Sequence, residues 1–473
     1  MRAAPGFNTM PVIRTPPTRP PMSPEPYYNR RLHWLALATA VATFPLIFMG
    51  GLVTTKQAGM SVPDWPNSYG YNMFLFPPNQ WVGGVFYEHT HRLMGSVVGL
   101  LSLALALQAY GPAARRRPRL MLGVGVVLTG LMSFFLTLIL VTIRGGQVPN
   151  VEQVFRGTAR TLEGMAGLFV VLLLAFVARR RDPRPAVRWV CLAVLGMVIL
   201  QGVLGGLRVV LVELKLAVVH ACVAQTFLCL AALAALVTSR LWDRLAPADA
   251  VGKARPAVGL GFVRLAAAAV AVVYLQLVVG ATMRHYDAGL AVPDVPLHYG
   301  KVLPPTDAAG LAAANLARAA SGHPDLRPVT LGQIWLHVGH RAGAVLVTVV
   351  LGVVVWRALR YPAAARPALR NPAVALVPLV LAQLTLGVLT VLLRKPADLA
   401  SLHVACGALV LVTTFALAAR SGRAHGWRLG SVRDEPTPEA RGFGVLVPAA
   451  GRGSTDRQND GCRTDLASLT ASR

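Results

Sequence analysis

The chain has 473 residues, of which 54% are hydrophobic and only 14% are charged, and its mean hydropathy is +0.53. This composition excludes an ordinary soluble domain and indicates a polytopic membrane protein. The formal net charge of +26 does not indicate nucleic-acid binding, because the basic residues gather in alternate connections between apolar segments. We expect this pattern to place both termini in the cytoplasm and to attract the protein to membrane lipid.

Ten apolar runs are long enough to cross a hydrocarbon core of roughly 30 Å, which takes about 20 helical residues. Only helices satisfy their backbone hydrogen bonds within a single segment in lipid, so the predicted fold is an all-α polytopic helix bundle. The runs are residues 33–54, 88–110, 120–143, 161–178, 187–210, 216–238, 259–283, 334–356, 372–393 and 400–419.

Segments outside these runs are polar and rich in Pro, Gly or Arg. We expect a disordered cytoplasmic arm at residues 1–32 and a disordered cytoplasmic tail at residues 420–473. A cytoplasmic linker at residues 239–258 would join an N-terminal bundle (33–238) to a C-terminal bundle (259–419). The first residues do not resemble a transit peptide, which favours a bacterial plasma membrane over a mitochondrial inner membrane.

A loop sequence occurs twice and marks an internal duplication. Residues 58–66 (AGMSVPDWP) reappear as residues 288–296 (AGLAVPDVP), at an offset of 230 residues. Each copy leads to an apolar run that carries a His-Arg pair. A second block, residues 201–220, parallels residues 383–403, and both copies end in a histidine.

The spacing of the copies predicts the architecture. The two His-Arg pairs are 249 residues apart, whereas the later histidines are only 183 apart. The first half therefore holds enough extra residues for two crossings, which we place in a helical hairpin at about residues 120–180. We expect two tandem four-helix bundles related by a pseudo-two-fold axis along the membrane normal, with this hairpin inserted in the first half.

Four duplicated histidines are the strongest candidates for chemistry. They are His91, His220, His340 and His403. Each lies a few residues into its apolar run, and the topology puts all four at a similar depth. A single such histidine is commonly a hydrogen-bonding residue between helices. Two level pairs instead indicate axial ligands for two haem irons.

The two halves differ beside the first histidine of each pair. Glu88 stands three residues before His91 and shares its helix face, whereas His337 takes that place in the second half. A carboxylate beside an iron ligand suggests proton handling or charge stabilisation, the alternative being a water-exposed interfacial glutamate.

Basic residues and the repeated loop offer further candidates. Arg92, Arg341 and Arg208 suit the carboxylates of haem propionates, the alternative being arginines that reach toward the membrane surface. Asp64 would anchor a turn or cap a helix, and Trp65 would form a lid or an interfacial anchor.

At these residues the sequence closely resembles the haem A synthase family, membrane enzymes that convert haem O to haem A for cytochrome oxidases. The resemblance is carried by TTKQAGMSVPDWP, EHTHRLMG, QGVLGGLRV, HVGHR and LRKPADLASLHVACGALVL. It covers about residues 33–110 and 187–419, and leaves the inserted hairpin and both tails uncovered.

The resemblance implies an oxidoreductase that oxidises a methyl group of haem O to a formyl group by successive hydroxylations. It implies that His91 and His220 bind the substrate haem, that Glu88 is catalytic, and that His340 and His403 bind the iron of a haem b cofactor. It also implies contact with haem O synthase, with cytochrome oxidase assembly factors and with an electron donor that the sequence does not identify.

Two other functions remain open at this point. A di-haem b-type membrane cytochrome would use the same four histidines only to pass electrons. A transporter would also show duplication and ten spans, but the polar residues gather near one border of the membrane rather than at its midplane.

Overall fold

The structure is a computed structural model that describes residues 28–110, 182, 184–245 and 257–427. The described residues form ten α-helices and no β-strand, and eight of the helices are long and apolar enough to cross a membrane. The eight are α1 (Arg30–Thr55), α2 (Gly83–Tyr110), α5 (Pro185–Leu211), α6 (Leu214–Val237), α8 (Leu260–His285), α10 (Leu331–Leu359), α11 (Arg366–Leu392) and α12 (Ala397–His425). The predicted all-α polytopic fold is confirmed, while the predicted spans 120–143 and 161–178 lie outside the described residues.

Short elements occur in the connections. The two further α-helices are α7 (Arg240–Arg244) and α9 (Ala308–Ala320), and the 3-10 turns are η1 (Met73–Leu75), η2 (Pro78–Gln80), η4 (Ala288–Leu290) and η5 (Ala363–Ala365). Helix α9 lies in the longer second loop, where the sequence had predicted only a connection. Its N-cap is Asp307, whose side chain accepts a hydrogen bond from the backbone of Gly310.

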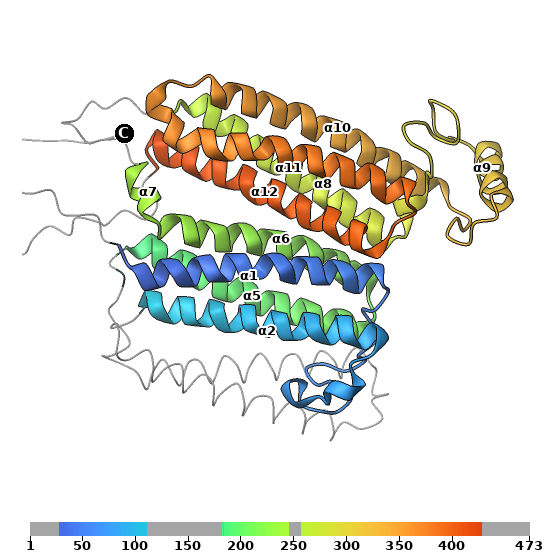
Figure 1. Ribbon diagram of the computed structural model, residues 1–473, viewed down its shortest axis with the longest axis horizontal. Helices are drawn as coiled ribbons and strands as arrows, with labels where there is room; N and C mark the ends of the chain where they lie inside the picture. The colour runs from blue at the N-terminus through green and yellow to red at the C-terminus, as the bar shows by residue number, and fades with distance from the viewer. Residues whose placement is uncertain (1–27, 111–181, 183, 246–256, 428–473) are drawn as a thin grey trace, which may run out of the picture. The chain divides into compact units, whose positions relative to one another are not determined.

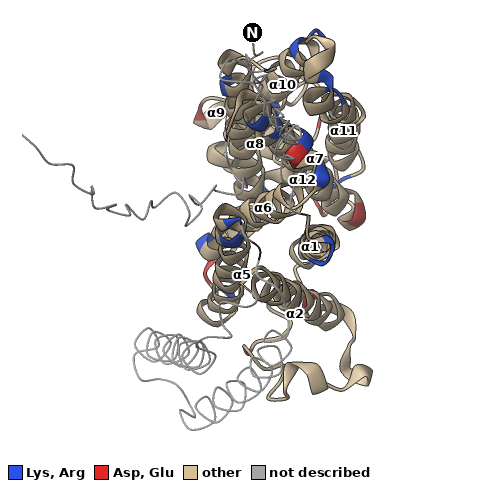
Figure 2. Cartoon of the chain, turned by 90° about the vertical axis from the view of Figure 1, so that its left-hand side faces the viewer, with Lys and Arg blue, Asp and Glu red and all other residues tan. Residues whose placement is uncertain are grey.

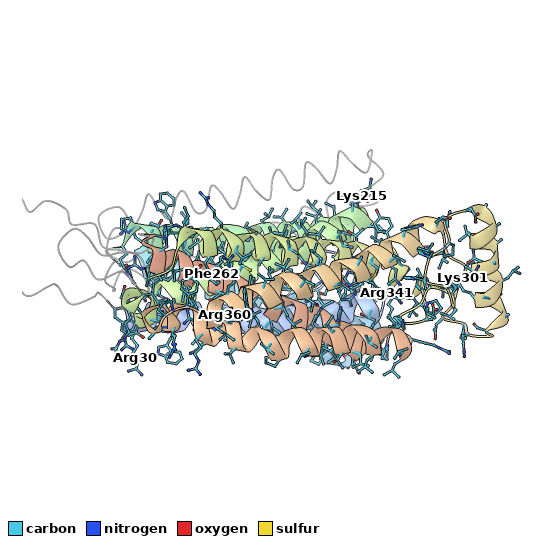
Figure 3. All side chains as sticks on the ribbon, turned by 90° about the horizontal axis from the view of Figure 1, so that it is seen from above. Arg30, Lys215, Phe262, Lys301, Arg341 and Arg360 are labelled. Atoms are coloured by element: carbon cyan, nitrogen blue, oxygen red, sulfur yellow. The ribbon has the colours of Figure 1, made fainter. Side chains whose placement is uncertain are left out.

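The long helices suit a hydrocarbon environment. The shortest, α6, has 24 residues and the longest have 29, so each exceeds the roughly 30 Å needed at 1.5 Å per residue. Figure 2, which looks along the helices from the end where α1 begins, shows Lys and Arg at that end. Figure 3 shows Arg30 and Arg360 toward one end of the bundle and Lys215 and Arg341 toward the other.

The eight long helices pack as two groups of four that share a boundary. In the first group, α1 contacts α2 and α6, and α5 contacts α2 and α6. In the second group, α8 contacts α10 and α12, and α11 contacts α10 and α12. Helices α1, α6, α8 and α12 make the contacts between the groups (Figures 1 and 2).

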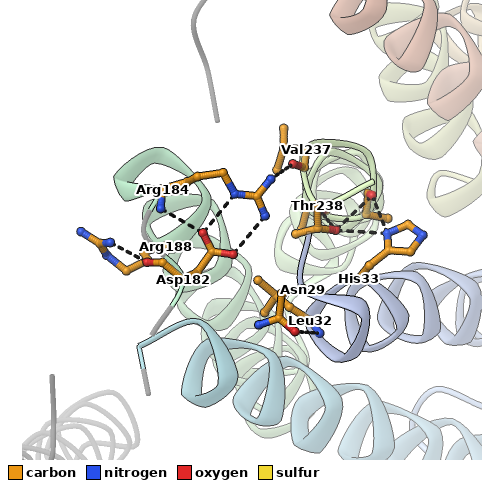
Figure 4. Close-up of polar contacts among 10 residues, drawn as sticks. Asn29, Leu32, His33, Asp182, Arg184, Arg188, Val237 and Thr238 are labelled. Carbon is orange, nitrogen blue, oxygen red and sulfur yellow. Dashed lines mark hydrogen bonds and ion pairs between the residues drawn. The ribbon is translucent and has the colours of Figure 1, made fainter. Parts of the chain in front are cut away.

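A buried ion pair joins the helices at the end where α1 begins. Asp182 and Arg184 form an ion pair of 3.0 Å, and their side chains are 0% and 2% exposed. Arg184 also donates to the carbonyl of Val237 at the end of α6 (Figure 4). The backbone N–H of Asp182 donates to the carbonyl of Ala109 near the end of α2. This cluster therefore fastens the start of α5 to the ends of two neighbours.

Candidate functional site

The described residues line a cavity of about 1860 Å³ that reaches both groups of helices. Its lining is mostly apolar and includes side chains from all eight long helices. The volume exceeds the roughly 300–1,000 Å³ of a typical small-molecule pocket. Nearly all the predicted site residues line it: Trp65, Glu88, His91, Arg92, Arg208, His220, His337, His340, Arg341 and His403. Asp64 does not.

The four histidines lie at one level. Each stands six to nine residues after the first residue of its helix, on α2, α6, α10 and α12. These helices all begin at the same end of the bundle, which we call the loop end because the repeated loops lie there. At 1.5 Å per residue the histidines are about 9–14 Å from the helix starts.

The second pair of histidines faces across the cavity. The ring centroids of His340 and His403 are 6.4 Å apart, and the ring planes make an angle of 72°. Imidazole nitrogens bind first-row metal ions at about 2 Å, so two rings on opposite sides of one ion have centroids on the order of 6 Å apart. The spacing therefore fits two axial ligands of one iron.

Each histidine ring lies against a glycine of a neighbouring helix. A Cβ atom at Gly50, Gly205, Gly280 or Gly387 would lie 3.0, 3.2, 2.9 or 3.0 Å from the Cε1 atom of His91, His220, His340 or His403 respectively. In every case Cε1 is nearest and Nε2 is farthest of the three ring atoms measured. We call these four residues the seat glycines. Because the order of the ring-atom distances is the same, all four rings have the same orientation toward their glycine. The sequence did not predict these glycines.

One nitrogen of each histidine ring faces the protein, so the other nitrogen is left to face the cavity. The Nδ1 atoms of His91, His220 and His403 are buried, and these histidines lie within reach of the backbone of Leu46, Gln201 and Gln383 respectively. Because the Nδ1 side is covered by protein, Nε2 is the nitrogen left for a ligand, and in His403 this Nε2 lies 3.3 Å from the side-chain nitrogen of Gln383.

The repeated loops dock on the bundle through the two residues that distinguish the halves. The backbone N–H of Val62 donates to Oε2 of Glu88 at 2.9 Å, and the N–H of Val292, its counterpart in the repeat, donates to Nδ1 of His337 at 3.2 Å. Glu88 and His337 are only 4% and 2% exposed. The prediction that these residues are equivalent agrees with this shared contact, and Glu88 is not a water-exposed glutamate.

Each loop is closed by its aspartate. Asp64 accepts hydrogen bonds from the N–H groups of Tyr69 and Gly70, and Asp294 accepts them from Tyr299 and Gly300, all at 2.7–2.8 Å. Burial on its own would raise the pKa of Asp294, but the N–H groups of Gly300 and Tyr299 hold that pKa below its ordinary value. The geometry fits the expected role of these aspartates as turn anchors.

The arginines after the first histidines clamp these loops. Arg92 donates to the carbonyls of Asp64, Asn67 and Val62 and pairs with Glu88 at 2.9 Å. Arg341 donates to the carbonyls of Val292 and Leu297. Both arginines line the cavity, and within the described residues Arg92 donates four hydrogen bonds to protein partners and Arg341 donates two. Arg208 makes a single hydrogen bond, at 3.3 Å to the carbonyl of Gly59.

A family comparison agrees with this site. Residues 151–415, more than half of the chain, match the model of the cytochrome oxidase assembly protein family COX15-CtaA. The chain belongs to this family. The match includes His220, His340 and His403, whereas His91 and Glu88 precede it. No curated protein matches the chain.

Membership of the cytochrome oxidase assembly family connects the chain with haem A synthesis and, together with the eight apolar helices, shows that it is an integral membrane protein. Within the described residues no cluster of three or more His, Cys, Asp or Glu side chains could chelate a bare metal ion. Two histidines whose rings face each other, as those of His340 and His403 do, have the chemistry to bind a haem iron.

Further residues at the cavity were not predicted from sequence. Arg284 of α8 lines the cavity and donates to the carbonyl of Gly51 and to Oγ1 of Thr55 on α1. His285 ends α8 and also lines the cavity. Trp65, in contrast, was a predicted site residue. Its indole lies against Gly206 of α5, where a Cβ would collide with the ring. That packing suits a lid at the loop end.

Proposed function

We propose that the chain is a haem A synthase-like oxidoreductase that oxidises a methyl group of haem O to a formyl group. The observation that supports this most is the cavity, which holds two histidine pairs on four equivalent seats but has a carboxylate beside only one pair. In this proposal His91 and His220 bind the substrate, and His340 and His403 bind haem b. The unequal neighbours, Glu88 and His337, favour chemistry at one site over electron transfer through two similar sites.

The proposal includes a duplicated architecture. Two tandem four-helix bundles related by a pseudo-two-fold axis, with a hairpin inserted at about residues 120–180, would place the two haems in matching sites. The paired loop contacts at Val62 and Val292 and the four seat glycines support this arrangement. We further propose that both termini lie in the cytoplasm of a bacterium and that the loop end faces out of its plasma membrane.

The residues present fit the cofactor. The 6.4 Å separation of the His340 and His403 rings suits bis-imidazole ligation. Each ring packs against a neighbouring helix at a glycine, and this contact limits movement of the ring away from the cavity. Haem b bound there would supply one-electron transfer to the neighbouring site. The apolar lining keeps water from the substrate and strengthens each electrostatic contact in the cavity.

In the proposed reaction each of two successive hydroxylations replaces a C–H bond of the substrate methyl group with a C–O bond, a two-electron oxidation whose oxidant and oxygen atom come from outside the chain. Loss of water from the resulting gem-diol then leaves the formyl group without further oxidation. Glu88 is the residue placed to assist these steps. Its two oxygens each receive one hydrogen bond from the protein, so each keeps a lone pair for the substrate. The carboxylate can stabilise positive charge that develops beside it, and it can pass the proton of one diol hydroxyl to the other hydroxyl, which then leaves as water.

Cationic side chains near the loop end would bind the substrate and cofactor carboxylates. Arg208 and Arg284 line the cavity and, among the described residues, neither forms an ion pair with a carboxylate. Buried guanidinium groups gain most from an anionic partner, and porphyrin propionates supply one. Arg92 and Arg341 would mainly hold the loops, with any propionate contact added to that role.

The test is the haem content of membranes that express this chain together with a haem O synthase. We expect formyl-haem by mass and absorbance for the native chain, and retained protohaem without formyl product for Glu88→Gln. His337→Gln alters the matching loop contact in the second half, so its yield measures the effect of that contact alone. Bound protohaem without formyl-haem from the native chain would indicate a di-haem cytochrome, and normal yield from Glu88→Gln would remove Glu88 from the mechanism.

A further inference from the structure

The cavity reaches farther from the loop end in the first half than in the second. Helix α2 corresponds to α10 through His91 and His340, so Leu100 of α2 corresponds to Val349 of α10. Both of these residues line the cavity, and Val349 is the last lining residue of α10. On α2 the lining continues to Tyr110, the last residue of the helix. At 1.5 Å per residue this extension is about 15 Å long.

Helix α5 forms the other wall of the extension. It corresponds to α11 through the seat glycines Gly205 and Gly387. The first lining residue of α11 is Val380, whereas the lining of α5 begins six residues earlier in the alignment, at Leu192. Helices α2 and α5 contact each other (Figures 1 and 2). We call this extension the α2–α5 branch; among the described residues it is lined by Leu103, Ala106, Leu107, Tyr110, Leu192 and Leu195.

Glycines widen the cavity between the histidine level and the α2–α5 branch. Gly99 of α2 and Gly202 of α5 both line the cavity, and a Cβ at either would meet no other atom of the described residues within 4 Å. The corresponding residues of the second half are Thr348 and Leu384, which line the cavity as well. Side chains therefore project into the second half of the cavity at two positions where the first half is open.

The two proposed haems differ in the same way as the two halves. Haem O carries a hydroxyethylfarnesyl chain that haem b lacks, and this chain leaves the porphyrin edge opposite the propionates. The proposed propionate partners Arg208 and Arg284 lie near the loop end, where α5 and α8 end. A haem whose propionates reach these arginines directs its opposite edge away from the loop end, which is the direction of the branch. The walls of the branch are apolar, and an extended farnesyl chain has a similar length.

We propose that the α2–α5 branch binds the farnesyl chain of haem O, so that the first site selects a prenylated haem and the second site takes haem b. This inference rests on the proposed function, which assigns haem O to His91 and His220. Two axial ligands leave a porphyrin free to rotate about the axis that joins them. A chain held in the branch removes this freedom and keeps the same methyl group beside Glu88 at every turnover.

The experiment titrates the purified full-length chain, which retains protohaem in its second site, with either haem O or further protohaem, and follows binding by absorbance. Leu103→Trp puts a larger side chain into the branch and should weaken haem O binding roughly tenfold, an effect typical of overpacking. The affinity for the added protohaem, which has no farnesyl chain, should stay the same. The matched control is Leu101→Trp, the same change on α2 at a residue outside the cavity lining, and it should affect neither haem.

A second variant tests the same point without a large aromatic residue. Gly99→Thr combined with Gly202→Leu gives the first half the side chains of the second, and both Cβ atoms enter open space, so we expect the variant to fold. It should also weaken haem O binding more than protohaem binding. The protohaem that copurifies with each variant reports whether the second site is intact.

The outcomes separate the inference from the proposed function. Unchanged haem O binding in both variants, or equal losses for haem O and protohaem, would overturn the inference and leave the proposed function intact. Loss of a copurifying phospholipid from Leu103→Trp with unchanged haem O binding would also overturn it, because a lipid chain would then be the occupant. A native chain that binds protohaem but no haem O would refute the proposed function, and the inference with it.

Discussion

Substitution of a seat glycine is a direct probe of haem ligation. In Gly280→Ala the new Cβ would lie 2.9 Å from Cε1 of His340, whereas carbon atoms in contact prefer about 3.5–4.0 Å. The ring must therefore move by roughly 0.5–1 Å, which reaches the tolerance of about 0.5 Å within which a binding group works. Overpacking of this kind costs about 1–3 kcal/mol, so we expect haem b to bind roughly 5- to 150-fold more weakly.

The assay is the protohaem content of purified protein, with the absorption spectrum of its low-spin iron. Gly339→Ala is the matched control, because it adds the same methyl group next to His340 but its Cβ would meet no other atom within 4 Å. The looser seat at Gly205, with 3.2 Å to its histidine, should tolerate alanine better than Gly280. Full protohaem occupancy in Gly280→Ala would refute the idea that the seats set the position of the ligand.

Two further predictions concern stability. Asp182→Ala leaves Arg184 buried without the Asp182 carboxylate, and breaking a buried ion pair typically costs about 3–5 kcal/mol. The melting temperature in detergent should therefore fall strongly. Asp287→Ala removes a more exposed pair with Lys395 and should change the free energy of unfolding by less than about 1 kcal/mol. A similar melting temperature for the two variants would contradict this account. For the second loop, the lowered pKa of Asp294 means that its contribution is present above the ordinary value of 3.8 and is lost as the pH falls through the lowered value. Hydrogen exchange at the N–H of Gly300 should therefore stay slow at pH 5 and accelerate only well below pH 4, and acceleration already near pH 5 would show that the carboxylate does not anchor the turn.

The duplicated spacing was the most informative part of the sequence for the site. Because both loops and both His-Arg pairs repeat, the four histidines could be chosen over His89, His298 and His323, and all four line one cavity.

Arg92 makes contacts that its position beside His91 did not predict. It follows His91 directly, which suggested a partner for a propionate, but successive residues on a helix point about 100° apart. The Arg92 side chain accordingly reaches the loop carbonyls of Asp64, Asn67 and Val62.

Helix α9 was missed for a different reason, since its alanine-rich sequence lacks the long apolar run by which the other helices were recognised.

By itself the sequence determined the membrane class, the eight described spans and the histidines, because hydropathy, helix length and repetition are local properties of the chain. Only the tertiary structure decided which glycine backs which histidine and which donors are already occupied. Gly50 and His91 are 41 residues apart and belong to different helices. Whether their side chains meet depends on the rotation and approach of two packed helices, and packing against the rest of the bundle sets these.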